Sequence, residues 1–205
     1  MKALPVIISF YTKNSPYEWH AEALGQSIKN LGLDYDIQGV ASLGSWEANC
    51  AYKPLFILEM LQKHRHSVLW VDSDAVFMRT LEWIDAFSAD IAVRVNHGLS
   101  CEHPSKIFSG TIYIDFNEKS FQLVKKWAEA CLEALLKKDR TEEVWDQQVL
   151  TCVLKNHLSN FTVGMLPREY LKIFDHPEDE EKCKNHIILQ NQASRIFKKW
   201  MNVKS

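Results

Sequence analysis

An apolar run that ends in two aspartates constrains this chain more than any other segment. Val68 to Val71 are all apolar, which predicts a strand buried on both faces, as in a parallel sheet. Asp72 and Asp74 follow at once, with Ser73 between them. Because side chains two positions apart in an extended chain point the same way, both carboxylates can converge just past the strand. Open α/β sheets bind their ligands at this carboxyl end.

Two converging carboxylates repel each other unless a cation lies between them. Hard oxygen ligands favour Mg²⁺ or Mn²⁺, and such ions often join protein carboxylates to substrate phosphates. Asp72 and Asp74 therefore predict a metal–diphosphate site at the strand end. The simpler interpretation is that Asp-Ser-Asp only caps a helix or forms a turn.

The composition places this segment in a single domain with a sizeable core. The chain has 205 residues, 46% of them apolar, which predicts one domain over residues 1–205. A net charge of −2 gives no general attraction to nucleic acid or to acidic membranes. The five cysteines are odd in number and include no CxxC pair, which favours reduced thiols and a cytoplasmic setting over disulfides or zinc. No segment is apolar for long enough to span a membrane, and residues 1–10 predict a first strand rather than a signal peptide.

Strand and helix signals alternate along the chain, beginning in β-α-β-α order. The predicted strands are 4–10, 35–40, 68–71, 90–95, 108–116, 161–166 and 186–189. The predicted helices are 15–31, 54–64, 81–87, 118–138, 144–156 and 194–200, and the predicted loops include 41–49, 96–105 and the acidic stretch 177–181. This order predicts an α/β sandwich whose mostly parallel sheet is flanked by helices.

Four further segments carry polar groups that can reach the carboxylate pair. The first two are at Lys53 and at residues 109–111. Lys53 opens a helix, where a cation opposes the helix dipole; it either meets an anionic ligand or is an ordinary solvated lysine. Ser109, Gly110 and Thr111 interrupt an apolar strand, so the glycine marks either a bulge or a close approach of a ligand to the backbone. The flanking hydroxyls can donate to a polyhydroxylated substrate.

The other two segments lie late in the chain. Asp146 either stabilises its own helix, or projects with Gln147 into the cleft to hold sugar hydroxyls or act at the reacting carbon. Gln190 follows the last predicted strand, and Arg195 lies just inside the last helix. Together with the helix N-terminus they can complete a diphosphate site. The histidines, His176 among them, lack ligand-like spacing and are assigned to the surface or to loops.

Six short segments occur in an order that has a known counterpart. They are Ser9-Phe10-Tyr11-Thr12, Tyr52-Lys53-Pro54, Leu69-Trp70-Val71-Asp72-Ser73-Asp74, Ser109-Gly110-Thr111, Trp145-Asp146-Gln147 and Gln192-Ala193-Ser194-Arg195. Together they resemble the GT-A type nucleotide-diphospho-sugar transferases, glycosyltransferases with a DxD motif. The resemblance spans nearly the whole chain and implies a Rossmann-like GT-A sandwich with the nucleotide over the first strands.

The resemblance also implies roles for individual residues. Asp72, Ser73 and Asp74 would bind Mn²⁺ or Mg²⁺ and the diphosphate or ribose of a nucleotide-sugar donor, a UDP-sugar. The nucleotide pocket would be lined by Phe10, Tyr11 and Thr12, with Lys53 and Arg195 nearby and with Ser109, Gly110, Thr111, Asp146 and Gln147 near the donor sugar. The resemblance favours a retaining reaction, whereas no motif identifies the acceptor, whether glycan, lipid-linked or protein.

One position departs from the family pattern. Such enzymes often supply a further metal ligand, commonly a histidine, shortly before the closing Gln-Ala-Ser-Arg segment. This chain has Gln190 there, and the nearest histidine is His186. An amide carbonyl can ligate Mg²⁺ or Mn²⁺ without bringing charge, so we expect Gln190 to join Asp72 and Asp74 as an uncharged third ligand.

Two other functions remain open on the sequence. Asp72 to Val76 after an apolar strand fits the nucleophile motif of haloacid-dehalogenase-like phosphatases, although two strands precede it and no second acidic pair follows. The other possible function is non-catalytic binding of a nucleotide sugar. It is motivated by Gln190, which stands where such enzymes often have a histidine ligand. Release of UDP from a UDP-sugar, binding without turnover, and hydrolysis of a phosphate monoester distinguish the three functions.

Overall fold

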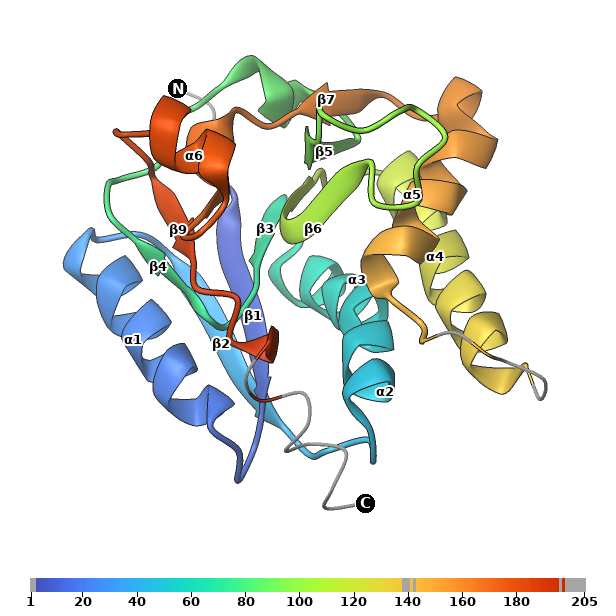
Figure 1. The fold of residues 1–205 in the computed structure, drawn as a ribbon, viewed down its shortest axis with the longest axis horizontal. Helices are drawn as coiled ribbons and strands as arrows, with labels where there is room; N and C mark the ends of the chain where they lie inside the picture. Colours follow the sequence, from blue (N-terminus) through green and yellow to red (C-terminus); the bar gives the residue numbers. More distant parts are fainter. Residues whose placement is uncertain (1–2, 138–140, 142, 196, 198–205) are drawn as a thin grey trace.

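A six-stranded central sheet forms the middle of the fold (Figure 1). The computed structural model describes residues 3–137, 141, 143–195 and 197. The strand order is β2-β1-β3-β6-β5-β7. The strands are β1 (Val6–Thr12), β2 (Tyr35–Val40), β3 (Val68–Val71), β5 (Ile91–Val95), β6 (Ile107–Ile114) and β7 (Val163–Met165). Of these six, only β6 runs antiparallel to its neighbours, so the sheet is mixed and mostly parallel, as the sequence predicts.

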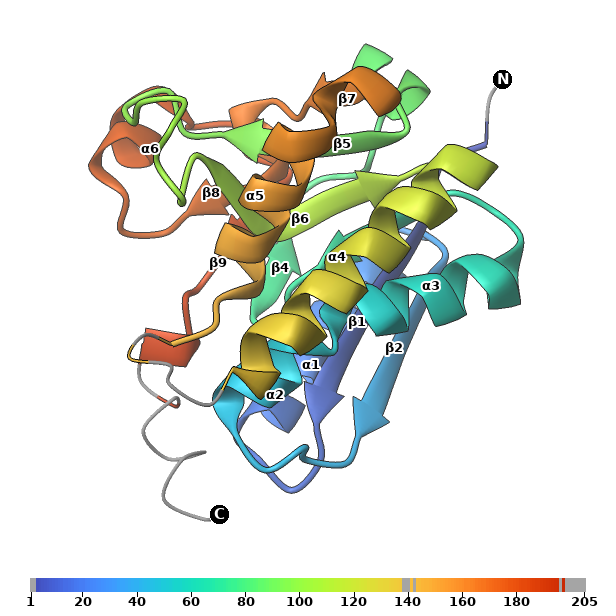
Figure 2. The same cartoon turned by 90° about the vertical axis from the view of Figure 1, so that its right-hand side faces the viewer.

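Helices cover both faces of this sheet (Figure 2). They are α1 (Tyr17–Asn30), α2 (Trp46–Ala51), α3 (Lys53–His64), α4 (Glu118–Leu136), α5 (Asp146–His157) and α6 (Pro177–Lys182). α1 packs on one face, and α3, α4 and α5 pack on the other. A second sheet in the order β4-β9-β8 lies on the α1 side; its strands are β4 (Ala75–Phe77), β9 (Ile188–Gln190) and β8 (Lys172–Ile173).

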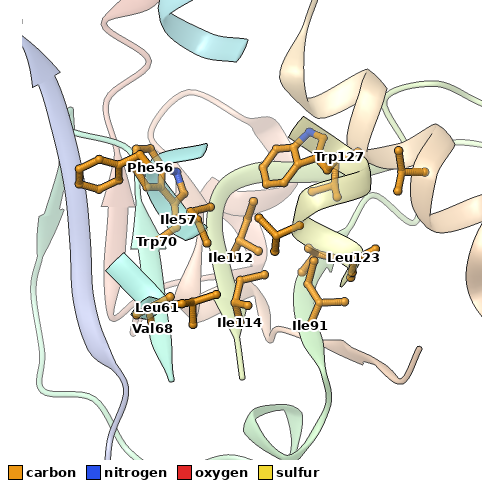
Figure 3. Packing of buried hydrophobic residues seen from close by; sticks show 14 of the residues in the cluster. Phe56, Ile57, Leu61, Val68, Trp70, Ile91, Ile112, Ile114, Leu123 and Trp127 are labelled. Atoms are coloured by element: carbon orange, nitrogen blue, oxygen red, sulfur yellow. The ribbon is translucent and has the colours of Figure 1, made fainter. Parts of the chain in front are cut away.

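Strand β3 is buried on both faces, as its apolar sequence predicts. Val68 and Trp70 point into a cluster with α3 and α4, where Figure 3 shows Trp70 near Phe56 and Val68 near Leu61. Leu69 and Val71 point into the second cluster, with α1 and the small sheet. None of the four β3 side chains is more than 2% exposed. Burial of each such side chain contributes about 1.5–3 kcal/mol, so packing fixes the strand that carries the two aspartates.

Local signals set the helix ends that frame the site. Pro16 precedes α1, and Gly32, with a φ of 67°, follows its end in the left-handed conformation that glycine tolerates best. The side chain of Asn117 caps α4 by accepting a hydrogen bond from the Ser120 N–H at 2.9 Å. The Trp127 indole of α4 donates to the Asp146 carbonyl at 3.0 Å, which joins α4 to the first residue of α5.

The predicted loop over 41–49 is wrong from Trp46 onward. Ser45 accepts a hydrogen bond from the Ala48 N–H at 3.1 Å and caps α2. Trp46 and Asn49 are buried on the inner side of this short helix. The glycine and serine before it resemble loop chemistry, and the burial that stabilises α2 comes from distant parts of the chain.

The acidic stretch 177–181 is also a helix, α6, rather than a solvated loop. Asp179 at its centre is fully buried and ion-paired with Arg94 and Arg168. Both arginines lie outside the acidic stretch, 85 and 11 residues away from Asp179 along the sequence. The acidic stretch by itself therefore suggests solvent exposure. Long-range ion pairing overrides that expectation.

The predicted helix over 81–87 is wrong as well. Residues 81–84 have no regular structure, and a 3₁₀ turn, η1 (Asp85–Ser88), follows. Leu81 and Phe87 are nevertheless buried, so their apolar character reports burial without a helix. Strands β4 and β8 were not predicted from the sequence, because two or three residues carry too little periodicity.

The end of the chain is described only in part. Ser194, Arg195 and Phe197 are helical, whereas residues 196 and 198–200 of the predicted terminal helix lie outside the described residues. All five cysteines are unbridged, in agreement with the predicted reduced thiols. No helix within the described ranges is both long enough and apolar enough to cross a membrane.

Candidate active site

A cavity of about 340 Å³ opens at the carboxyl ends of β1 and β3. It contains most of the residues predicted to form the site: Phe10, Tyr11, Thr12, Lys53, Asp72, Ser73, Asp74, Ser109, Gly110, Asp146, Gln147 and Arg195. Two predicted residues, Thr111 and Gln190, are buried and do not line it. The six segments thus come together around one cavity although they span most of the chain.

Lys53 is the centre of the charged groups in this cavity. Its ammonium lies 2.8 Å from Asp146 Oδ2 and 3.1 Å from Asp72 Oδ1, and it donates to the Ser109 carbonyl at 3.2 Å. The side chain is only 5% exposed, so Lys53 is not a solvated surface lysine. It also lies over the Trp70 ring, 5.2 Å from the centroid. Burial lowers its pKa, but Asp146 and Asp72 outweigh burial and raise it above the ordinary value, so the side chain remains charged.

Asp72 is held on one oxygen and open on the other. The Trp70 indole donates to Oδ1 at 2.9 Å, on the same atom that faces Lys53. Oδ2 points toward Gly110, within 3.4 Å of the place where a β-carbon on that glycine would stand. The side chain is 36% exposed, which makes it the most accessible member of this charged group.

Asp74 is more deeply buried and is tied to the segment after β9. The Ala193 N–H donates to its Oδ2 at 2.6 Å, and the Asn191 side chain donates to its carbonyl at 2.7 Å. Burial, and then the neighbouring Asp72, raise the pKa of Asp74 to about 6. Both carboxylates line the same cavity, and their binding of a shared metal stays a prediction.

The glycine in β6 lies at a bulge, and the side chain of Gln190 approaches it closely; an approach by a ligand stays a prediction. The pairing of β5 with β6 shifts register beside it, and the Gly110 carbonyl accepts from the Asp72 N–H at 2.9 Å. A β-carbon at this position would lie 3.3 Å from the Gln190 amide. The Ser109 N–H donates to Gln147 Oε1 at 3.2 Å, which fixes the Gln147 side chain at the cavity wall.

Asp146 does not act as a side-chain cap of its own helix. The N-cap of α5 is Trp145, and no side chain caps that helix end. Instead the Asp146 carboxylate turns toward Lys53 and is 6% exposed. Asp146 is therefore not the N-cap, but it is an acidic residue in the first turn of α5, as the structural alternative allows. Its carboxylate also lines the cavity, and its role at a donor sugar stays a prediction.

A family model for nucleotide-diphospho-sugar transferases matches residues 47–198. The chain belongs to this family. Its fold is similar to that of a solved glycosyltransferase involved in the glycosylation of the major capsid of PBCV-1, with a TM-score of 0.67 and 12% identity over 96% of this chain and 99% of that chain. At this identity the likeness shows the fold alone. Comparison with curated proteins found no match.

Membership of the nucleotide-diphospho-sugar transferases confirms the resemblance drawn from the six segments and identifies the chain as a glycosyltransferase. The GT-A type sandwich predicted from the sequence is likewise confirmed by the fold. The choice between a transferase and a phosphatase is thereby decided in favour of the transferase.

The residues of this transferase fit a hard divalent ion. Its described residues contain no cluster of three His, Cys, Asp or Glu side chains that could hold a metal alone. Asp72 and Asp74 supply carboxylate oxygens, and Gln190 Oε1 is buried with no hydrogen-bond partner. The Gln190 Nε2 donates to Gly110 at 2.9 Å, which directs Oε1 away from that carbonyl. This all-oxygen donor set suits Mg²⁺ or Mn²⁺, and the metal ligands stay a prediction.

Two residues that the sequence interpretation missed present unused donors to the cavity. Asn49 is 6% exposed; its Oδ1 accepts from the Leu43 N–H at 2.9 Å, and its Nδ2 has no partner among the described residues. The buried hydroxyl of Tyr17 donates to none of them either. Its pKa is raised, chiefly by burial and then by Cys50 and the two aspartates, so it remains a protonated donor. Helical spacing assigns Tyr17 to the core, and only its place in the first turn of α1 could have signalled otherwise.

Residues 171–176, which include β8 and end just before α6, form a further part of the cavity wall. Leu171, Ile173 and His176 line it, and the His176 ring meets the edge of Phe108 at a centroid distance of 6.4 Å. His176 lies in a loop as predicted, but that loop faces the cavity. Arg195 is ion-paired with Asp175 at the cavity edge, so its contact with a diphosphate stays a prediction.

Proposed function

We propose that this transferase moves a sugar from a UDP-sugar to an acceptor hydroxyl with the help of Mn²⁺ or Mg²⁺. In this reaction the acceptor oxygen bonds to the anomeric carbon, the bond from that carbon to the diphosphate breaks, and the acceptor proton is released. The observation that carries the proposal is the contact of Lys53 with Asp72 and Asp146 in a cavity that Asp74 also lines. A divalent ion bound there would neutralise the donor diphosphate as it leaves.

We assign a binding role to each group of residues that lines the cavity. Phe10, Tyr11 and Thr12 at the end of β1 are proposed to line the nucleotide pocket. Asp146 and Gln147 are proposed to act at the donor sugar, where a carboxylate and an amide can hold hydroxyls. We further propose one transferase domain in a reduced cytoplasmic setting, which the five unbridged cysteines support.

Retention of anomeric configuration is supported by how the carboxylates of the cavity are used. An inverting transfer needs a base placed opposite the leaving diphosphate. The carboxylates that line the described cavity are Asp72, Asp74 and Asp146. The first two are assigned to the metal, and the third is held by the Lys53 ammonium at 2.8 Å, so it is not free to accept a proton from an acceptor hydroxyl.

His176 carries the alternative, an inverting reaction. It lines the cavity, and an imidazole there can take a proton from an acceptor hydroxyl. NMR of the first-formed product distinguishes the two outcomes by the configuration at the anomeric carbon. With retention, His176→Gln keeps most of the activity; with inversion by His176, that variant loses it.

A panel of nucleotide sugars tests the proposal directly. The protein is incubated with UDP-, GDP- and dTDP-sugars and Mn²⁺, with glycan, lipid-linked or peptide acceptors, and the released nucleotide is measured. UDP release that increases with one acceptor class supports the transferase. Tight UDP-sugar binding with no release under any acceptor would instead assign the chain to non-catalytic binding.

A further inference from the structure

We infer that Lys53 is a built-in counter-ion that holds the cavity in a metal-poor state until nucleotide arrives. The inference rests on the proposed function, because it concerns how the same site takes its divalent ion. Lys53 contacts two carboxylates at once, at 3.1 Å for Asp72 and 2.8 Å for Asp146. It is a positioning residue, since it acts on the metal through these side chains.

The environment of Lys53 keeps its charge in place. The side chain is 5% exposed, and its ammonium contacts the Ser109 carbonyl and hydroxyl besides the carboxylates. It cannot leave for solvent without exposing two carboxylates to each other inside the protein. Removal of one member of a buried ion pair strands the other charge, so the cation remains bound in the resting protein.

This fixed cation opposes a divalent ion in two ways. It occupies Asp72 Oδ1, so that Oδ2 is the oxygen left for a metal, and its positive charge repels an incoming ion. Asp146 moderates the repulsion by sharing the charge of Lys53. A nucleotide diphosphate brings negative charge of its own, and metal and nucleotide then strengthen each other's binding.

The inference predicts opposite changes for two substitutions that both damage the same ion pair. Lys53→Met removes the cation and should tighten Mn²⁺ binding to the nucleotide-free protein by about tenfold, equivalent to about 1.4 kcal/mol. Asp146→Asn leaves the cation to act on Asp72 alone and should weaken Mn²⁺ binding severalfold. A merely structural role of the ion pair would weaken Mn²⁺ binding in both variants.

The experiment is a Mn²⁺ titration of the whole chain at pH 7.5, read by the EPR signal of free Mn²⁺, with and without UDP. Lys63→Met is the matched control, because Lys63 lies in the same helix and pairs with Asp36 at 2.7 Å but is 54% exposed and outside the cavity. It should leave Mn²⁺ affinity unchanged. Circular dichroism checks that each variant is folded.

The outcomes separate this inference from the function it rests on. Tighter binding in Lys53→Met with weaker binding in Asp146→Asn supports it. If the parent protein binds Mn²⁺ with UDP but folded Lys53→Met binds no more tightly, or if Lys63→Met gains equally, the role of Lys53 is overturned and the transferase proposal stands. If Lys53→Met does not fold, unchanged or tighter binding in Asp146→Asn overturns the inference alone. No Mn²⁺ binding in parent or variants, even with UDP, overturns the metal site and both proposals together.

Discussion

The molecule contains two clusters in which basic and acidic side chains pair, and they differ in how many carboxylate oxygens are already occupied by protein donors. The Arg94 cluster consists of Arg94, Arg168 and Asp179, and the Lys53 cluster of Lys53, Asp72 and Asp146. In the Arg94 cluster every carboxylate oxygen is used: Oδ1 of Asp179 accepts from both arginines at 2.5 Å, and Oδ2 accepts from Arg94 at 2.6 Å and from the Ile173 N–H at 2.8 Å.

In the Lys53 cluster the carboxylates keep free positions that face a cavity. Asp72 Oδ2 points toward Gly110, and Asp72 is 36% exposed, whereas Asp179 is fully buried. Bidentate arginine pairing saturates a carboxylate, while a lysine makes a point contact and leaves acceptor capacity. We propose that the saturated cluster stabilises the fold and that the unsaturated one binds ligands.

The largest effect expected from this comparison is on stability. Arg94→Met leaves Asp179 with a buried charge whose bidentate partner is gone, and should lower the free energy of unfolding by about 3–5 kcal/mol. Urea unfolding followed by fluorescence measures it. Lys63→Met, at an exposed pair with Asp36, is the control and should cost only about 0–1 kcal/mol. A cost for Arg94→Met no larger than the control would break the comparison.

The pH dependence of the same variant gives a second check. Burial raises the pKa of Asp179, but Arg94, the Ile173 N–H and Arg168 together lower it by more than burial raises it. The net pKa of Asp179 therefore lies below its ordinary value. The stabilisation is therefore complete above the unfolded-state pKa, about 3.9, and is lost as the pH falls through the lower native pKa. The stability difference between the parent and Arg94→Met should narrow below about pH 4.

The next largest effect is on catalysis and belongs to the Lys53 cluster. If Asp146 acts at the donor sugar as proposed, Asp146→Asn should lower transfer at saturating donor and Mn²⁺ by about 10²–10³-fold, because it removes a negative charge from the cavity wall. UDP affinity at saturating Mn²⁺ should change little. Glu118→Gln removes a first-turn carboxylate from α4 on the exposed surface and should retain full activity. Near-parental turnover by Asp146→Asn would assign that residue to structure.

The strand and the motif that organise the site were visible in the sequence, since both depend on local pattern. The run from Val68 to Val71 predicts a doubly buried strand, and alternation within it places Asp72 and Asp74 just beyond its end. The carboxyl ends of parallel β1 and β3 meet at the same edge of the sheet, which brings the segments at Phe10 and Asp72 together. The other four segments reach this cavity from the starts of α3 and α5, from antiparallel β6 and from the residues after β9.

What the sequence hid depends on contacts between distant residues. The acidic run around Asp179 is indistinguishable from a solvated loop until Arg94 is placed beside it. Lys53 at a helix start suggests either solvent or an anionic ligand, whereas in the fold it faces two carboxylates of its own chain. Tyr17 and Asn49 carry no motif, and only the burial of their unused donors marks them.

The unsaturated cluster should also make nucleotide binding depend on metal. UDP at about 100 times its dissociation constant should stabilise the fold by roughly 2.7 kcal/mol in the presence of Mn²⁺. With EDTA the stabilisation should largely disappear, because the diphosphate then meets Asp72 and Asp74 without a neutralising ion. Thermal unfolding with UDP, Mn²⁺, both and neither measures this. Equal shifts with Mn²⁺ and with EDTA would contradict a metal role for the two aspartates.

The smallest effect we predict is a change in UDP affinity caused by substitution of Tyr17. The group removed there is a neutral hydrogen-bond donor, whereas the groups in the two clusters are charged. Its hydroxyl is buried, protonated and unused as a donor near both aspartates, so a phosphate oxygen of the nucleotide is a suitable acceptor. Tyr17→Phe keeps the ring and its 5.9 Å contact with Phe197 while removing one hydrogen bond, which is worth about 1 kcal/mol, or about fivefold in UDP affinity.

A second tyrosine provides the control for this small effect. Tyr52 packs on Phe10 at a centroid distance of 5.4 Å, but its hydroxyl contacts Glu59 at 3.0 Å and it does not line the cavity. Calorimetric titration with UDP and Mn²⁺ should show weaker binding for Tyr17→Phe and unchanged binding for Tyr52→Phe. If both variants bind UDP as the parent does, the Tyr17 hydroxyl faces protein rather than ligand. If both lose affinity equally, the loss reflects general loosening around β1, and only a loss confined to Tyr17→Phe extends the ligand-binding group beyond its charged members.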